Sequence, residues 1–184
     1  MIDPATASVS DPTADIVELD LDAYRAAIPG MAELIVDVVN GGSSVNFLAG
    51  VTLADAAAWW AARTESVASG QTSAFVARSA GRIVGSTLLI RATQANAPHR
   101  AEIVKVLVHR EARRQGLGRA LMLVAEARAR ADGRWLLFLD TVTGSPADAF
   151  YRSLGWQEAG PIPNFAMDPD GGLLSATYFW KDLR

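Results

Sequence analysis

The stretch that decides the fold runs from Glu102 to Leu121 and reads EIVKVLVHREARRQGLGRAL. Its apolar first part, residues 103–108, predicts a buried strand, and a helix opens at Gly116 after an arginine-rich turn. Glycines let a ligand approach the backbone closely, the free amides of a helix start attract anions, and arginines suit phosphate. We therefore expect a pyrophosphate-binding turn made by Arg113, Arg114, Gln115, Gly116, Leu117, Gly118 and Arg119.

The spacing in this turn excludes two common phosphate-binding motifs. A dinucleotide-binding G-x-G-x-x-G would need a third glycine where Leu121 stands, and no P-loop run G-x-x-x-x-G-K-S/T exists in the chain. The residues RRQGLG (113–118), followed by Ala120, instead resemble the acyl-CoA signature of the GNAT acetyltransferases. That signature is Gln or Arg, two residues, Gly, one residue, and Gly or Ala.

Composition limits the other classes of function. The chain has 184 residues, half of them hydrophobic, and a net charge of −3, which favours one domain (16–184) after a flexible tail (1–15) and argues against nucleic acid as a partner. It has no cysteine and only two histidines without partners at ligand spacing, so we expect no metal site. Its start lacks the features of a signal peptide, and no apolar run reaches the roughly 18 residues of a membrane helix, so we expect a cytoplasmic protein without membrane contact.

The remaining chain alternates helical and strand patterns. We expect a helix over 24–38 with a kink or a break at Pro29-Gly30, a loop over 40–50, a second helix over 52–69 and a helix over 145–155. The expected strands are 16–19, 72–78, 82–91, 101–108, 134–140, 156–159 and 174–180. The helix opened at Gly116 joins the strands 101–108 and 134–140, which should therefore be parallel. The class is a mixed α/β fold, with a mostly antiparallel central sheet, one parallel pair and flanking helices.

This order of elements is similar to that of the GNAT fold. The segment AFYRSLGW (149–156) resembles a second GNAT motif, although Gly144 stands where many members have Asn. A closer resemblance is to the tabtoxin resistance acetyltransferases, which acetylate a small amino-acid-like antibiotic. It is carried by NGGSSVNF (40–47), RAEIVKVLV (100–108), LDTVTGSPADAFY (139–151) and PDGGLLSATYFWKDL (169–183).

Three residues suit the chemistry of amine acetylation. An alkylammonium has a pKa near ~10, so a base must take its proton, and an acid near the departing thiolate helps. Glu102 and Asp140 are candidate bases and Tyr151 is the candidate acid, by position in the resembled families. Alternatives remain: Glu102 could pair with Lys105 or Arg100, Asp140 could cap the backbone of 141–144, and Tyr151 could be a core aromatic.

The resemblance implies acetyl-CoA as the co-substrate and direct attack by the amine, since no cysteine is present to form an acyl-enzyme. The pantetheine would lie along Val106, Leu107 and Val108. Its acceptor would be a small-molecule amine contacted by the loop residues Asn40, Gly42, Ser43, Asn46 and Phe47. The chain would be a monomer or a homodimer. A different amine (a protein N-terminus, a polyamine or an aminoglycoside) and a non-catalytic acyl-CoA sensor are the alternatives.

Overall fold

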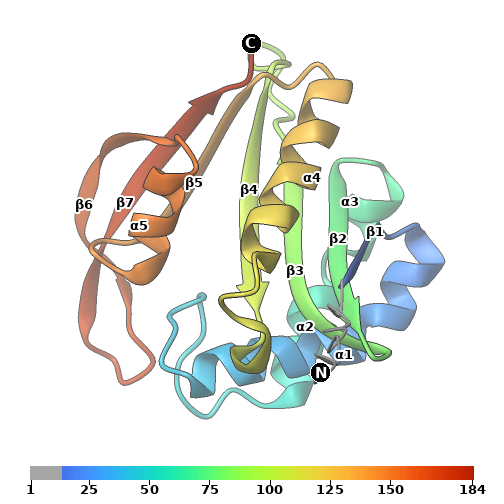
Figure 1. Ribbon diagram of the computed structural model, residues 1–184, viewed down its shortest axis with the longest axis vertical. Helices are drawn as coiled ribbons and strands as arrows, with labels where there is room; N and C mark the ends of the chain where they lie inside the picture. Colours follow the sequence, from blue (N-terminus) through green and yellow to red (C-terminus); the bar gives the residue numbers. More distant parts are fainter. Residues whose placement is uncertain (1–13) are drawn as a thin grey trace, which may run out of the picture.

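The computed structural model describes residues 14–184, which form one seven-stranded sheet with helices on both faces (Figure 1). The strands are β1 (Asp15–Glu18), β2 (Thr72–Ser79), β3 (Arg82–Arg91), β4 (Arg100–Val108), β5 (Leu136–Val142), β6 (Gln157–Met167) and β7 (Leu173–Asp182). The helices are α1 (Leu21–Asn40), α2 (Leu53–Ala61), α3 (Thr64–Ala68), α4 (Leu117–Ala131), α5 (Pro146–Ser153) and the short 3₁₀ turn η1 (Arg110–Ala112). Residues 1–13 of the expected tail lie outside the described residues, and its last residue, Asp15, already belongs to β1.

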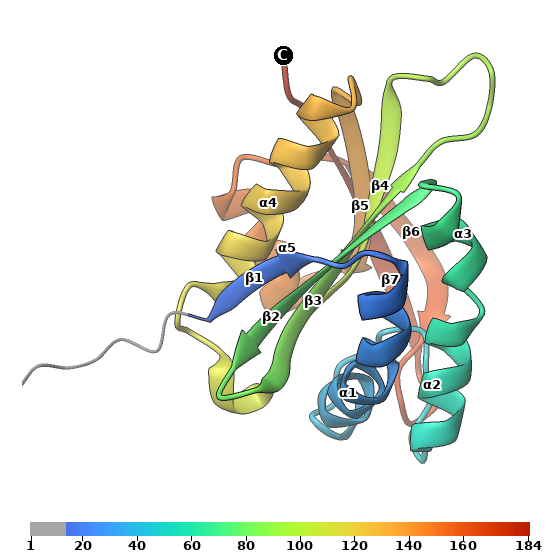
Figure 2. The ribbon, with the colours of Figure 1, turned by 90° about the vertical axis from the view of Figure 1, so that its right-hand side faces the viewer.

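The sheet has the order β1-β2-β3-β4-β5-β7-β6, and within residues 14–184 only the β4–β5 pair is parallel. This confirms the predicted fold class. Helices α4 and α5 cover one face, and α1, α2 and α3 lie against the other (Figure 2). The first face buries Leu121, Leu137 and Phe179, and the second buries Tyr24 and Trp60. The sheet therefore separates two apolar cores.

Helix α1 runs through Pro29 without a break, so the expectation of two shorter helices is wrong. Pro29 and Arg25, whose carbonyl loses its helical partner, are both exposed residues. The buried side continues past it, from Tyr24 and Ala27 to Met31 and Leu34, and holds the helix together by packing. Although α1 has 20 residues, no helix of the described chain is long and apolar enough to cross a membrane.

The single helix expected over 52–69 is two helices, α2 and α3. Its start is as predicted, because Thr52 and Asp55 form a reciprocal capping box. The interruption comes near Arg63, whose guanidinium lies 3.2 Å from the centre of the Trp59 ring and donates to the Trp59 carbonyl at 2.7 Å. This hydrogen bond satisfies one of the carbonyl groups that lack a helical partner at the end of α2.

Two strand predictions also need correction. We expected β5 over 134–140, but the strand runs from Leu136 to Val142, and Asp140 is an exposed residue within it. We expected a loop after residue 160, but β6 extends to Met167. Prolines at 161 and 163 are tolerated there because β6 is an edge strand, and irregular pairing with β7 accommodates them.

The two parallel strands part soon after they meet. The paired residues are Arg100 with Leu136, Ala101 with Leu137 and Glu102 with Phe138. Beyond them β4 pairs only with β3, and β5 only with β7, in the described structure. In Figure 1 the two strands visibly diverge below their shared end. We call this opening, between 103–108 of β4 and 139–142 of β5, the strand split.

Candidate active site

The turn after β4 leads into a helix start whose backbone amides are free. Gly116 is the N-cap of α4 in the left-handed region (φ 78°), and no side chain of the described residues caps this helix. The three other helices of eight residues or more each have a capping side chain, from Asp20, Thr52 and Ser145. The amides at the start of α4 therefore remain available to an anion, with the positive end of the helix dipole behind them.

The arginines around this helix start divide into two groups. Arg113, Arg114 and Arg119 are exposed, and Arg113 is held by a 3.2 Å hydrogen bond from its Nε to the carbonyl of Val108. Arg110 lies in the same arginine-rich stretch, but its Nε donates to Asp37 at 2.8 Å and its backbone amide donates to the same carboxylate. That arginine anchors η1 to α1, so three arginines remain for a ligand.

The glycines of the turn show whether a pyrophosphate fits. A Cβ added to Gly116 would meet no atom within 4 Å, so the space over this backbone is open to a ligand. A Cβ on Gly118 would lie 3.3 Å from the Phe150 ring, so this glycine lets α4 approach α5. Open backbone, uncapped amides and three exposed arginines fit the pyrophosphate of an acyl-CoA.

The strand split suits the extended pantetheine arm of the same acyl-CoA. Leu107 and Val108 pair with β3 on one side, Val106 lies in an irregular stretch just before them, and none of the three has a strand partner on the β5 side in the described structure. Their free backbone groups can accept an extended chain as an added strand does. The split and the α4 start are consecutive along the chain, so one ligand can contact both.

A bulge in β4 re-aims one side chain toward the opposite face. Val104 pairs with Leu88 and Leu107 with Ser86, so two residues of β4 face one residue of β3 between these pairs. Lys105 in this bulge has φ 55°, and its carbonyl accepts a 3.0 Å hydrogen bond from the buried hydroxyl of Ser86. The bulge turns Lys105 to the face of the sheet that carries α1 and α2.

Lys105 is a buried ammonium between the loop after α1 and helix α2. Its Nζ donates to the Val45 carbonyl at 2.8 Å and lies 4.5 Å from the centre of the Trp59 ring. No carboxylate of the described chain forms an ion pair with it. Burial, aided by the charge of Arg63, lowers the pKa of Lys105 to about 8 against the attraction of Asp140 and Glu102.

Glu102 and Asp140 flank the strand split on one face of the sheet. Ala101 and Ile103 of β4, and Leu137 and Leu139 of β5, pack into the α4 core. Strand alternation therefore turns both carboxylates toward the other face. Burial raises the pKa of Glu102, the charge of Asp140 raises it further, and Lys105 opposes both effects. Although Asp140 is an exposed residue, its carboxyl group is partly withdrawn from water, and this raises its pKa against the positive charge of Lys105.

Neither structural alternative for these carboxylates is found. Within residues 14–184, Glu102 forms no salt bridge with Lys105 or Arg100. The amide of Gly144, which Asp140 was a candidate to cap, instead donates to Asp148 at 2.9 Å. Both carboxylates are thus available to a ligand.

Tyr151 lies on the other side of the split, in the core beneath α5. It is 7% exposed and packs against Trp156 and Phe179, so its interpretation as a core aromatic is supported. Burial, and then the charge of Asp140, raise the pKa of its phenol well above the ordinary value. The hydroxyl therefore keeps its proton at every physiological pH, as a proton donor must.

The loop after α1 spans two parts of the site. Gly41 lies against the Arg110 side chain, so Asn40 and Gly42 belong to a turn beside η1. Phe47, in contrast, packs edge-on to Trp59 at 6.3 Å, beside Lys105. Ser43 is half-buried between these parts and Asn46 is exposed. The structure therefore brings only the second half of this loop next to Lys105.

The same loop is tied to the β6–β7 turn. Ser44 donates from Oγ to the Met167 carbonyl at 2.8 Å, and the amide of Ala49 donates to the Pro169 carbonyl at 2.8 Å. The 41–50 loop and the β6–β7 turn together border one side of the split, on the face that carries the carboxylates. We call this region the acceptor side.

From the sequence, Lys105 was expected only as a possible partner of Glu102. Trp59 and Arg63 were not assigned to the site at all. The signal for Lys105 was present, because a lysine interrupts the otherwise apolar run IVKVLV. Its orientation could not be predicted, since regular alternation would have turned it toward α4.

These features suit an acyl-CoA that lies in the split and against the start of α4. A family model described as "Acetyltransferase (GNAT) family" matches residues 49–156. The chain therefore belongs to the GNAT family of acetyltransferases, whose acetyl donor is acetyl-CoA.

Solved structures share the fold at low identity. The yncA protein of Salmonella typhimurium, whose structure contains its cofactor acetyl-CoA, is 20% identical over 93% of this chain and 94% of its own, with a TM-score of 0.72. The ribosomal-protein-alanine N-acetyltransferase of Brucella melitensis is 24% identical over 92% and 99%, with a TM-score of 0.70. A candidate phosphinothricin N-acetyltransferase is 16% identical over 92% and 98%, with a TM-score of 0.75.

Gly116→Val should raise the Kd for acetyl-CoA by tenfold or more, or about 1.4 kcal/mol, because the side chain fills the space over the helix start. Isothermal titration of the folded variant measures this. Gly81→Val is a matched control, since Gly81 has the same φ of 78° and equally open surroundings in the β2–β3 turn. Equal acetyl-CoA affinity in the two variants would contradict the assignment of the anion site.

Lys105→Met should be more stable than the wild type at pH 7, and this advantage should shrink as the pH rises. Below pH 8 the folded protein holds a buried ammonium. From pH 8 to the ordinary value of 10.5 the folded state has lost this proton while the unfolded state keeps it, so wild-type stability rises by up to about 3 kcal/mol relative to the variant. Urea unfolding from pH 7 to pH 10 measures the difference, and a difference independent of pH would show that Lys105 has an ordinary pKa.

Proposed function

We propose that this protein transfers the acetyl group of acetyl-CoA to the primary amine of a small amino-acid-like molecule, by direct attack. The observation that carries this proposal is a pair of carboxylates beside the strand split, Glu102 and Asp140, which form no salt bridge within residues 14–184. When bound, acetyl-CoA supplies an activated acyl group as its thioester. The protein's residues must then bind the amine, remove its proton and supply one to the departing sulfur.

Glu102 is the better base of the two. Burial and, after it, the charge of Asp140 raise the pKa of Glu102, so the Glu102 carboxylate binds a proton more strongly than an isolated one. A base whose pKa is nearer neutral accepts the ammonium proton more readily. Asp140 keeps its charge beside Glu102 and attracts the incoming ammonium. Tyr151, a protonated phenol near Asp140, is the proposed donor to the sulfur.

The acceptor side favours a small acceptor. Its turn contains Asp168 and Asp170, but the Asp168 carboxylate already accepts from the amides of Asp170 and Gly172 at 2.9 and 2.7 Å. A polycationic aminoglycoside needs several carboxylates to replace its hydration. Among the described residues, this region offers only Glu102, Asp140 and Asp170.

The resemblance to the tabtoxin resistance acetyltransferases supports an amino-acid-like toxin or antibiotic as the acceptor, and hence a role in resistance. The structural neighbours do not choose between acceptors, because one acts on a ribosomal-protein alanine and another carries the name of phosphinothricin. The choice therefore depends on the charges and the size of the site.

Release of free thiol from acetyl-CoA, with a panel of amines, tests this function. We expect turnover of amino-acid-type amines and little of spermidine, kanamycin or a peptide. Asn46→Ala and Ser43→Ala should raise the KM for the amine by several-fold and leave the KM for acetyl-CoA unchanged, while Ser79→Ala, at a half-buried serine beside the distant β2–β3 turn, changes neither. Faster turnover of kanamycin or a peptide, or acetyl-CoA binding without any turnover, would overturn the proposal.

Glu102→Gln should lower kcat/KM by about 10²–10⁴ near pH 7 and by less toward pH 10, where more of the amine is already neutral. Asp140→Asn should instead move the acidic limb of the pH profile of kcat/KM to lower pH. Loss of the neighbouring charge lowers the pKa of Glu102, so this base stays ionised in more acidic solution. A Glu102→Gln loss that is the same at all pH values would mean that Glu102 is not the base.

A further inference from the structure

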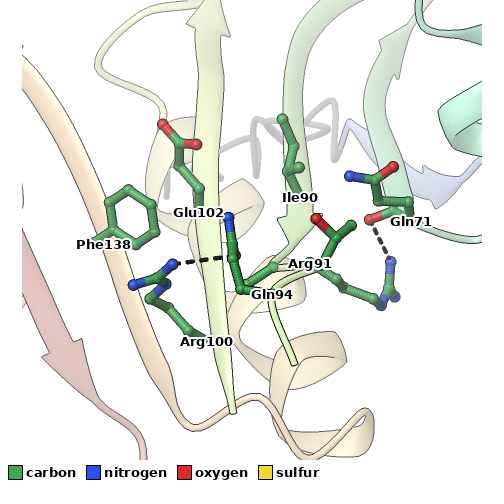
Figure 3. A pocket seen from close by; sticks show the side chains of 9 residues that line it. Gln71, Ile90, Arg91, Gln94, Arg100, Glu102 and Phe138 are labelled. Atoms are coloured by element: carbon green, nitrogen blue, oxygen red, sulfur yellow. Dashed lines mark hydrogen bonds between the residues drawn. The ribbon is translucent and has the colours of Figure 1, made fainter. Parts of the chain in front are cut away.

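A pocket of about 170 Å³ lies beside Glu102, on the side away from the β4 bulge. It is formed by the ends of β3, β4 and β5 and by the loop after β3 (Figure 3). Among the side chains that line it are Glu102 and Arg100 of β4, Phe138 of β5 and Gln94 of the loop. In Figure 3 Arg100 lies beside the Phe138 ring and reaches toward Gln94, while Glu102 follows on the same strand.

Two arginines line this pocket, and their bonding differs. Arg91 is fully engaged: its guanidinium donates to Asp132, to the hydroxyl of Ser73 and to the carbonyls of Gly70 and Gln71. It joins β3 to the end of α4, and its charge is neutralised by Asp132. Arg91 is therefore structural, and it has no donor left for a ligand.

Arg100, in contrast, has most of its donors free. One long hydrogen bond of 3.3 Å joins it to the side chain of Gln94. Its Nε is buried and finds no partner in the described structure, and no carboxylate there forms an ion pair with it. Its guanidinium carbon lies 5.7 Å from the centre of the Phe138 ring. Leaving a buried donor unsatisfied destabilises the free protein, so a ligand that bonds to this guanidinium gains affinity.

We propose that Arg100 binds a carboxylate of the acceptor and so places the acceptor's amine at Glu102. This inference rests on the proposed function and defines its substrate class further: an amine with a carboxylate several bonds away. Glu102 and Arg100 are two residues apart on one face of β4, so their Cα atoms are separated by about 7 Å. A negative and a positive group at that spacing complement a zwitterion of the length of 4-aminobutanoate, with Phe138 beside its chain.

Kinetics with 4-aminobutanoate and 4-aminobutanamide test the assignment, because these amines have the same length and differ only in the acidic group. The wild type should prefer the acid by tenfold or more in kcat/KM. Arg100→Met should remove this preference by raising the KM for the acid at least tenfold, with the KM for the amide and for acetyl-CoA unchanged. Arg100→Lys should restore part of it, because the charge is kept but the bidentate geometry is lost.

Arg134→Met is the matched control, since the Nε of Arg134 is likewise buried without a partner in the described chain, but this residue does not line the pocket. Its acid preference should equal that of the wild type. A wild type that acetylates both compounds equally, or acetylates other amino acids but neither of these, would overturn the role of Arg100. So would an Arg100→Met variant that loses both compounds alike. A wild type that acetylates no amino-acid-type amine would overturn the proposed function itself.

Discussion

The parting of β4 and β5 is the constraint on which the rest of the site depends. The crossover through α4 makes the two strands parallel neighbours, yet they pair over only three residues. Each then keeps a single neighbour, β3 or β7, and leaves one row of backbone groups without a strand partner in the described region. Unpaired strand edges are usually a liability, but here they face an opening that a ligand can fill.

The bulge at Lys105 connects this opening to the acceptor side. It bends β4 where the strands part, and it turns a lysine toward Val45 and Trp59 that regular alternation would have turned toward α4. Holding this ammonium away from water lowers stability, and its positive charge opposes the shared repulsion of Glu102 and Asp140. One backbone irregularity thus sets both the shape and the electrostatics of the site.

The sequence could predict what depends on local patterns and could not predict what depends on distant contacts. The Ser145 cap, the Thr52 capping box and the helix start at Gly116 follow from neighbouring residues, and all are found. The hydrogen bond from Arg110 to Asp37 joins residues 73 positions apart. The bulge at Lys105 is defined only by the pairing of β4 with β3. The two carboxylates were expected because they stand out within apolar strands. Arg100, Trp59 and Lys105 were not assigned to the site because their roles depend on contacts with distant parts of the chain.

Backbone amide chemical shifts during a titration with acetyl-CoA test the central claim most directly. If the strand split and the start of α4 hold the cofactor, the largest shift changes will fall on residues 106–108 and 115–119. These two groups should change together, with one Kd, because one molecule contacts both. Unchanged amides in both segments, with shifts confined to another surface such as the cavity beside Asp37 and Arg110, would contradict the account.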